Sequence, residues 1–235
     1  MEPGPVHGQI AQFIDDRILG TSGNCVAFRD DRSYYTGMDR DQRKQYNRER
    51  LLDKGVQILM DRGYHGTGIQ EILNEVGIPK GSFYNYFQSK EAFGAEVIAH
   101  YIEPFIEQLD GFLRRPELNP LTALHSYFDT LIEELTANQF KGGCLLGNLM
   151  GEIGDTSELC RCALQQALHR YRDKISEALE QAQQLNLIRQ DRNTTELADF
   201  LVDYWQGALL RMKVEHSAKP LKAFMVEVFE HTLAI

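Results

Sequence analysis

Apolar residues recur three and four positions apart along most of this 235-residue chain, and no segment shows the strict alternation of a half-buried strand. This period is that of amphipathic helices, and it is interrupted at glycine, proline and short polar runs. The pattern predicts an all-α protein in which a group of short helices precedes a bundle of longer ones. The expected helices cover residues 39–62, 69–76, 80–87, 90–103, 105–114, 121–136, 145–152, 157–185, 194–215 and 220–233.

The segment 67–90 is predicted to form two short helices joined by a glycine turn. Thr67 and Gln70 have the spacing of a capping box at the start of the first of them. Gly77 supplies the positive φ of the turn, and Pro79 presets the start of the second. Because the second helix is too short to be stable alone, it must be anchored by two aromatic side chains, Phe83 and Phe87.

The remaining side chains of the 80–87 helix point away from this anchor. They supply a cation, a hydroxyl, an amide and two phenols, which suit phosphate oxygens and base edges in the major groove of DNA. The alternative is an ordinary polar face in a small bundle, which is the commoner case for a single short helix. The residues concerned are Lys80, Ser82, Tyr84, Asn85 and Tyr86.

The formal net charge of −9 argues against nucleic-acid binding until the charge is located. Residues 38–90 carry nine Lys/Arg and seven Asp/Glu, a net charge of +2, whereas residues 1–37 carry −2 and residues 91–235 carry −9. The positive excess therefore falls on the segment that holds the suspected DNA-reading helix. The excess is modest, so geometry must supply part of any attraction to DNA.

Four motifs lie between residues 63 and 93: Gly-Tyr-x-x-Thr, Val-Gly-Ile, Lys-Gly-Ser-Phe-Tyr-Asn-Tyr-Phe and Ser-Lys-Glu-Ala-Phe. With their surroundings, over residues 44–96, they closely resemble the head of the tetracycline-repressor (TetR) family of bacterial transcription factors. The resemblance implies a helix-turn-helix DNA-binding domain over residues 39–90. It also implies a helical-bundle domain for ligand binding, regulation and dimerisation over residues 91–235.

The resemblance also implies which residues touch DNA. Pro79 is a departure, since many members place a polar helix cap there, and it leaves the approach of the 80–87 helix open. The residues implied to lie near bases are Gln70, Lys80, Gly81, Ser82 and Asn85. Those implied to hold phosphates are Thr67, Tyr84, Tyr86 and Lys90.

Family members pair their last two long helices across a two-fold axis, so a homodimer is expected here. Two heads about 34 to 36 Å apart would then reach successive major grooves of a palindromic operator. The apolar faces of these helices suit a dimer interface and equally suit an ordinary core. They contain Leu197, Leu201, Tyr204, Trp205, Ala208, Phe224 and Val228.

Cys144 follows two glycines and opens a helix, which places its sulfur near unpaired backbone N–H groups and favours the thiolate. The run Gly-Cys-Leu at 143–145 and the run Gly-Ala-x-Leu-x-x-Lys ending at Lys213 resemble the N-ethylmaleimide-responsive branch of the family. The resemblance implies a regulatory role for Cys144 and Lys213 in sensing electrophiles. A buried, inert cysteine in a helix-packing motif is the equally weighted alternative.

A second sensing hypothesis requires no covalent chemistry. Aromatic and methionine side chains of the body could line an apolar pocket for a small inducer, although such stripes usually form core. The candidates are Tyr101, Phe105, Tyr127, Phe128, Met150 and Trp205, with Phe112, Tyr204 and Met212.

Residues 1–37 show no convincing period, so residues 1–38 are expected to be disordered, or spurious if translation starts at Met38. With no apolar run of 18 residues and no signal-peptide pattern, a cytoplasmic protein without membrane association is expected. Four cysteines are too few for a disulfide scaffold. No spacing suggests a metal site, a cofactor or catalysis, so an enzyme or a helical interaction module that does not bind DNA is only the alternative.

Overall fold

The computed structural model describes residues 37–235, and all regular structure in that range is helical, as predicted. All but the last two residues of the predicted N-terminal extension lie outside the described residues. The elements are α2 (Arg40–Arg62), α3 (Ile69–Val76), the 3₁₀ helix η3 (Lys80–Asn85), α4 (Lys90–Leu113), α5 (Pro120–Ala137), α6 (Leu145–Ile153), α7 (Glu158–Gln184), α8 (Thr194–Glu215), α9 (Lys219–Val226) and the π-helical turn η4 (Glu227–Thr232).

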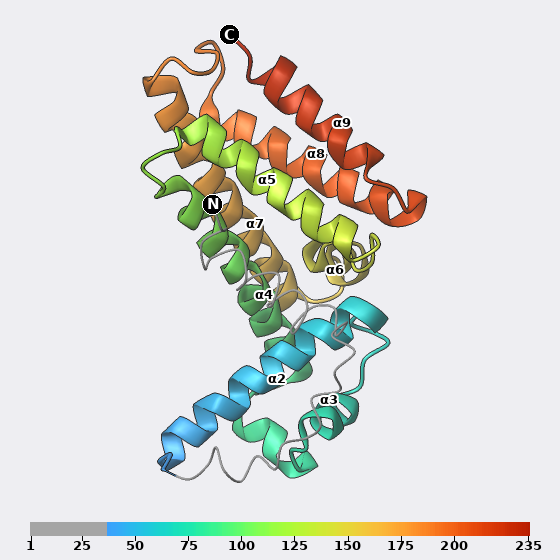
Figure 1. Ribbon diagram of the computed structural model, residues 1–235. Helices are drawn as coiled ribbons and strands as arrows, with labels where there is room; N and C mark the ends of the chain where they lie inside the picture. The colour runs from blue at the N-terminus through green and yellow to red at the C-terminus, as the bar shows by residue number, and fades with distance from the viewer. Residues whose placement is uncertain (1–36) are drawn as a thin grey trace.

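The molecule has a small head and a larger helical body (Figure 1). The head contains α2, α3 and η3, and α4 runs from it into the body, where it packs against α5 and α7. The body continues through α8, which lies between α7 and α9. The short helix α6 contacts both α2 and α7, so it lies where the head meets the body.

Most helix starts are set by side-chain caps, which satisfy the free N–H groups of the first turn. Asp39 and Gln42 form a reciprocal capping box at α2. Ser89 caps α4, because its Oγ accepts from the Ala92 N–H at 3.0 Å. The starts of α5, α7 and α8 are capped in the same way by Asn119, Ser157 and Asn193.

The predicted capping box of Thr67 and Gln70 is wrong. Helix α3 begins after Gly68, and no side chain caps it. The Thr67 hydroxyl instead donates to the carbonyl of Gly63 at 2.6 Å, and Thr67 is only 2% exposed. The Thr67 hydroxyl therefore closes the turn between α2 and α3, and it does not cap α3.

The predicted division at Pro104 is also wrong, since α4 is one continuous helix through this proline. Proline removes a single backbone N–H donor, which is a local loss. Helix α4 buries residues on both sides of Pro104, including Tyr101, Ile102, Leu109 and Phe112, and it packs along α7. Packing of both halves against one partner offsets the missing hydrogen bond.

Two other bounds differ from expectation. The predicted 80–87 helix is a 3₁₀ helix that ends at Asn85, because Ser82 N–H donates to the Pro79 carbonyl and Tyr86 N–H to the Phe83 carbonyl. The predicted 220–233 helix is α9 followed by the π-helical turn η4.

The apolar face of α8 and α9 is mainly core of this chain. Phe128 of α5 packs against Trp205 and Phe224, with ring centroids 5.0 and 4.9 Å apart. Of the residues that suited either a core or a dimer interface, all but the half-buried Tyr204 are buried here. The exposed apolar residues of these helices are others, namely Phe200, Leu210, Val214 and Val226.

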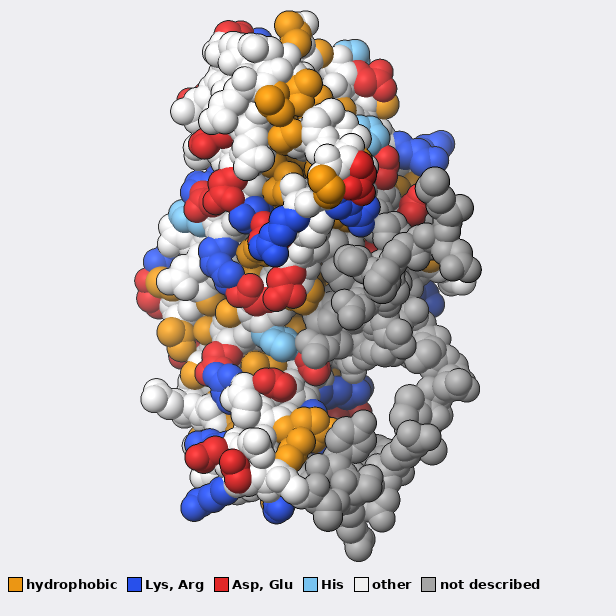
Figure 2. All heavy atoms as spheres, turned by 60° about the vertical axis from the view of Figure 1, so that its left-hand side comes forward, with side chains coloured by type: hydrophobic (Ala, Val, Ile, Leu, Met, Phe, Trp, Pro, Cys, Tyr) orange, Lys and Arg blue, Asp and Glu red, His pale blue; other side chains and the backbone are white. Residues whose placement is uncertain are grey.

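Figure 2 shows one face of the molecule, on which basic and acidic side chains are interspersed along its length. Two ion pairs join α7 to α4: Arg170 to Glu103 at 2.6 Å and Lys174 to Asp110 at 2.9 Å. Such half-exposed pairs contribute little stability each, so the packing of α4 on α7 is held mainly by its buried residues.

Candidate nucleic-acid interface and regulatory cavity

The 3₁₀ helix η3 is held by the two aromatic residues that were predicted to anchor it. Phe83 and Phe87 are buried, and their rings pack edge-to-face with Phe93 of α4, with centroids 5.8 and 4.9 Å away. Burying this side turns the opposite side outwards, so that Tyr84 is 67% exposed and Asn85 and Gly81 are also exposed. The head therefore presents a short helix with polar groups directed to solvent.

The other three predicted base-contacting residues lie on α3 and η3. Gln70 is exposed on α3, and its amide donates to the Asn74 side chain at 2.7 Å. Ser82 is half-buried, and Lys80 is the first residue of η3. The structure thus places Gln70, Gly81, Asn85 and Tyr84 on exposed parts of adjacent elements.

Three of the four predicted phosphate-binding residues already make hydrogen bonds within the protein. Thr67 is buried, with its hydroxyl bonded to Gly63. The Lys90 ammonium donates to the Tyr64 carbonyl at 2.7 Å and lies 4.4 Å from the Tyr64 ring centroid. Burial lowers the pKa of Lys90, while the nearby Glu152 carboxylate acts in the opposite direction. The Tyr86 hydroxyl accepts from Asn47 at 3.4 Å. A phosphate contact by these side chains would compete with bonds they already make.

One carboxylate of the body forms hydrogen bonds with the turn that follows α2. Glu152 of α6 accepts from the backbone N–H of Tyr64 at 2.8 Å and from that of His65 at 2.5 Å. On the same helix, the Asn148 amide contacts the Met60 sulfur at 3.5 Å. Because Lys90 holds the Tyr64 carbonyl, the start of α4, the end of α2 and the end of α6 meet at this turn.

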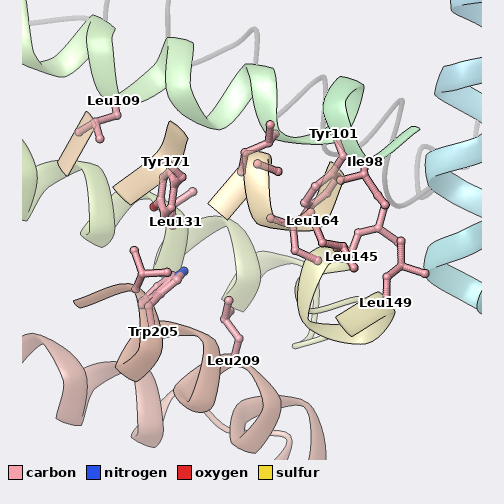
Figure 3. Packing of buried hydrophobic residues seen from close by; sticks show 14 of the residues in the cluster. Ile98, Tyr101, Leu109, Leu131, Leu145, Leu149, Leu164, Tyr171, Trp205 and Leu209 are labelled. Carbon is pink, nitrogen blue, oxygen red and sulfur yellow. The ribbon is translucent and has the colours of Figure 1, made fainter. Parts of the chain in front are cut away.

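A cavity of about 60 Å³ lies at the other end of α6, between α4, α5, α7 and α8. Figure 3 shows Leu131, Tyr171, Trp205 and Leu209, which converge on it from three of these helices. Of the residues predicted for a ligand pocket, Tyr101, Phe105 and Trp205 line this cavity. The others lie elsewhere: Tyr127, Phe128, Phe112 and Met212 are buried in the surrounding core, Tyr204 lines a separate surface hollow, and Met150 is exposed on α6.

Cys144 lines this cavity and is the residue from which α6 begins, as predicted. The preceding Gly142 and Gly143 have φ of 83° and 78°, a conformation that favours glycine. The Gln206 amide N–H donates to the Cys144 sulfur at 3.3 Å. Burial raises the pKa of Tyr101, and the adjacent Cys144 adds to this effect. The aliphatic part of the Lys213 side chain lies beside Gly143.

Three buried oxygen atoms in this region have no hydrogen-bond partner among the described residues: Glu134 Oε2, Gln206 Oε1 and Gln108 Oε1. Glu134 and Gln206 line the cavity, and the Gln108 amide donates to Glu134 Oε1 at 3.5 Å. Burial raises the pKa of Glu134 to about 7. Behind the wall, the Tyr171 hydroxyl bonds that of Tyr127 at 2.9 Å. The cavity is therefore mainly apolar, and two of its lining residues, Glu134 and Gln206, carry acceptor oxygens without partners among the described residues.

Comparison with known proteins decides the family. Residues 51–97 match the family described as bacterial regulatory proteins, tetR family, and residues 120–228 match the tetracyclin repressor-like C-terminal domain. The chain is 37% identical over 186 residues to the HTH-type transcriptional repressor DhaR of Mycobacterium sp. (strain GP1), which covers 79% of this chain and 92% of that one. The chain belongs to the TetR family.

Other relatives of this TetR-family protein agree. The HTH-type transcriptional repressor NemR of Escherichia coli (strain K12) is 31% identical over 181 residues, which cover 77% of this chain and 91% of NemR. The crystal structure of the reduced form of E. coli NemR superposes with a TM-score of 0.71 at 32% identity, over 79% of this chain and 96% of that one. The regulatory protein TetR from Rhodobacter sphaeroides gives the same TM-score and identity, over 78% and 97%.

Family membership makes this protein a DNA-binding transcription regulator and gives no support to the enzyme or to a helical module that does not bind DNA. Within residues 37–235, His, Cys, Asp and Glu form no group of three that could hold a metal ion. None of the helices in that range is long and apolar enough to span a membrane.

Sequence reasoning missed two carboxylates of this TetR-family protein, Glu134 at the cavity and Glu152 at the contact with the head. Glu134 stands between Glu133 and Leu135 in a run that resembles a solvated helix face, and Glu152 lies 88 residues from the Tyr64 backbone that it binds. The only local signal is position: Glu152 lies at i+8 from Cys144 on the short helix already singled out for its cysteine.

Glu134→Gln is expected to stabilise this TetR-family protein at alkaline pH. The folded protein raises the pKa of Glu134 from 4.5 to about 7, so it binds the proton more tightly than the unfolded chain does. Stability is therefore lost as pH rises through this interval. At 1.36 kcal/mol per pKa unit, and reduced for partial solvent screening, the effect is about 1–2 kcal/mol. Urea unfolding should show that the variant's advantage grows by this amount between pH 5 and pH 8; an advantage independent of pH would contradict the assignment.

Proposed function

We propose that this protein is a homodimeric repressor that binds a palindromic DNA operator through the exposed side of η3. A small inducer, or an electrophile that reacts with Cys144, acts at the cavity and releases the operator. The observation that carries the proposal is the span of α6. Its N-cap Cys144 lies beside the cavity, and Glu152 in its last turn binds the backbone of the head. A change at one end of so short a helix is transmitted to the other, which shifts the population toward a dimer with altered head positions.

Two features support operator binding. The exposed groups of η3 include an amide and a phenol, and the head lies within residues 38–90, the net-positive segment of an acidic chain. The relatives DhaR and NemR are named as HTH-type transcriptional repressors. We propose that Gln70, Lys80, Gly81, Ser82 and Asn85 contact bases and that Tyr84, Tyr86 and Lys90 contact phosphates. The buried Thr67 hydroxyl, bonded to Gly63, instead holds the turn that leads to α3.

A homodimer would bring two heads to successive major grooves, and α8 with α9 offers the surface for it. Phe200, Leu210, Val214 and Val226 are apolar residues of these helices that this chain leaves exposed. Light scattering should give twice the monomer mass; a monomer at micromolar concentration would count against the proposal.

Asn85→Ala is expected to weaken operator binding about tenfold or more, because a bidentate amide-to-base contact is worth about 1–3 kcal/mol. The test is an electrophoretic shift with DNA from upstream of the protein's own gene, repeated over a range of salt concentrations. The matched control is Gln165→Ala, an exposed amide on α7 that should bind like the wild type. Absence of salt-sensitive binding by the wild-type protein to selected duplexes would refute operator recognition.

Cys144→Ser is expected to abolish release of the operator by N-ethylmaleimide. The wild type and the control Cys162→Ser should both lose at least tenfold in operator affinity after treatment, with the adduct mapped to Cys144 by mass spectrometry. Cys162 is the matched control because it is half-buried on α7, away from this cavity. Equal release of Cys144→Ser and wild type would reject the thiol mechanism in favour of a bound, non-covalent inducer. Lys213→Ala, next to Gly143, tests the second implied regulatory residue in the same assay.

A further inference from the structure

The acceptor groups of the cavity are incompletely bonded. Gln108 satisfies one oxygen of Glu134, and Oε2 remains buried without a partner among the described residues. The Gln206 amide N–H donates to the Cys144 sulfur, and Gln206 Oε1 is also buried without a partner among the described residues. Buried polar atoms are nearly always paired, and unpaired ones cost stability. These two acceptors belong to residues of α5 and α8 that line one cavity, and Gln206 Oε1 lies beside Gly147 of α6. They mark where a ligand donor would bind.

We propose that the inducer is a small molecule with N–H donors, in its simplest form a short primary ammonium ion, and that its donor group binds Glu134 Oε2 with Gln206 Oε1 as a second acceptor. This inference rests on the proposed role of the cavity as the inducer site. A water-sized position takes about 10–15 Å³, so the 60 Å³ cavity holds roughly four to six non-hydrogen atoms. The apolar walls from Tyr101, Trp205 and Leu209 would surround a short hydrocarbon chain.

The charges around Glu134 favour a cationic donor. The groups that interact with it are Gln108 from α4, and Tyr127 and Glu133 on its own helix. The other polar or titratable residues on the cavity are Tyr171 of α7, Gln206 of α8, and Cys144 with Lys141, Asn138 and Tyr101. Lys141 is the one cation among the cavity residues, and Glu134 Oε2 has no partner among the described residues. Burial raises the pKa of Glu134 to about 7, and an ammonium ion beside it would lower that pKa again. Binding at pH 7 therefore releases protons.

The test is calorimetric titration of the full-length dimer with propylammonium, 1-propanol and propionate, which share a three-carbon chain. Propylammonium should bind at least tenfold more tightly than propionate. Titration in two buffers of different ionisation enthalpy should show that binding at pH 7 releases protons, because Glu134 is partly protonated there.

Glu134→Gln should bind propylammonium at least tenfold more weakly and release no proton, whereas Glu107→Gln, an exposed carboxylate of α4 that does not line the cavity, should match the wild type. Propionate binding as tightly as propylammonium, or unchanged binding by Glu134→Gln, would overturn the inference. Operator binding by the same preparations separates the two proposals. A wild-type protein that binds operator but does not discriminate among the three compounds refutes only the ligand class, whereas failure to bind any operator refutes the repressor.

Discussion

Gly63→Ala is expected to lower the free energy of unfolding by about 3–5 kcal/mol and to weaken operator binding strongly. Gly63 has φ 72° and ψ 177°, a conformation essentially restricted to glycine, and imposing it on alanine costs about 1–3 kcal/mol. An added Cβ would also lie 2.6 Å from Glu152 Oε2. Displacing this carboxylate weakens its bonds to Tyr64 and His65, each worth about 1.5–3 kcal/mol as charge-assisted bonds.

The matched control is Gly68→Ala, five residues further along the same connection. Gly68 has φ −93°, and an added Cβ there meets nothing within 4 Å. Urea unfolding and fluorescence anisotropy with labelled operator should both distinguish the two variants. If the two alanines behaved alike, the contact between α6 and the head would not be the link between cavity and DNA.

Phe83→Ala is expected to destabilise the head by about 3–5 kcal/mol, the usual cost of removing a fully buried phenylalanine. The six-residue η3 has no stability of its own, since so short a helix depends on tertiary packing. Loss of the ring removes its stacking against Phe87 and Phe93 and leaves a cavity in the head. Operator binding should fall below detection while most of the helical circular dichroism, which comes from α4 to α9, remains.

Tyr84→Ala is the control for this stability effect, because it removes an adjacent aromatic ring that is 67% exposed. Its unfolding free energy should stay within about 0.5 kcal/mol of the wild type. Hydrogen exchange of the backbone amides of η3 gives the second readout, with protection lost in Phe83→Ala and kept in Tyr84→Ala. Protection kept in both variants would show that Phe83 does not hold this helix.

Local rules account for much of the fold. The period of Ile69, Ile72, Leu73 and Val76 predicted α3 with its observed bounds, and the αL conformation of Gly77 follows from its place in the turn. The prediction that Phe83 and Phe87 face inwards also held, because a short helix between two others has one side to bury. These features depend on neighbours within four or five residues, which the sequence shows directly.

Other features could not be predicted in this way. Thr67 has the spacing of a cap, but the turn to Gly63 takes its hydroxyl. Pro104 has the chemistry of a helix breaker, but packing along α7 keeps α4 whole. Local preferences of about 1–3 kcal/mol are overruled when an entire helix face is buried.

The sequence by itself determined that this protein is all-α, that residues 67–90 form a helix-turn-helix, and that Cys144 opens a helix at an unusual glycine-rich run. Only the tertiary structure decided which side chains meet across the chain. Tyr127 and Phe128 are buried in the core, whereas Tyr101 and Trp205 line the cavity. The sequence could not separate the two cases, because aromatic residues at helical spacing suit a core and a cavity wall equally well. Glu152 binds, and Glu134 is buried by, segments that are distant in the sequence. No local sequence pattern indicates such contacts.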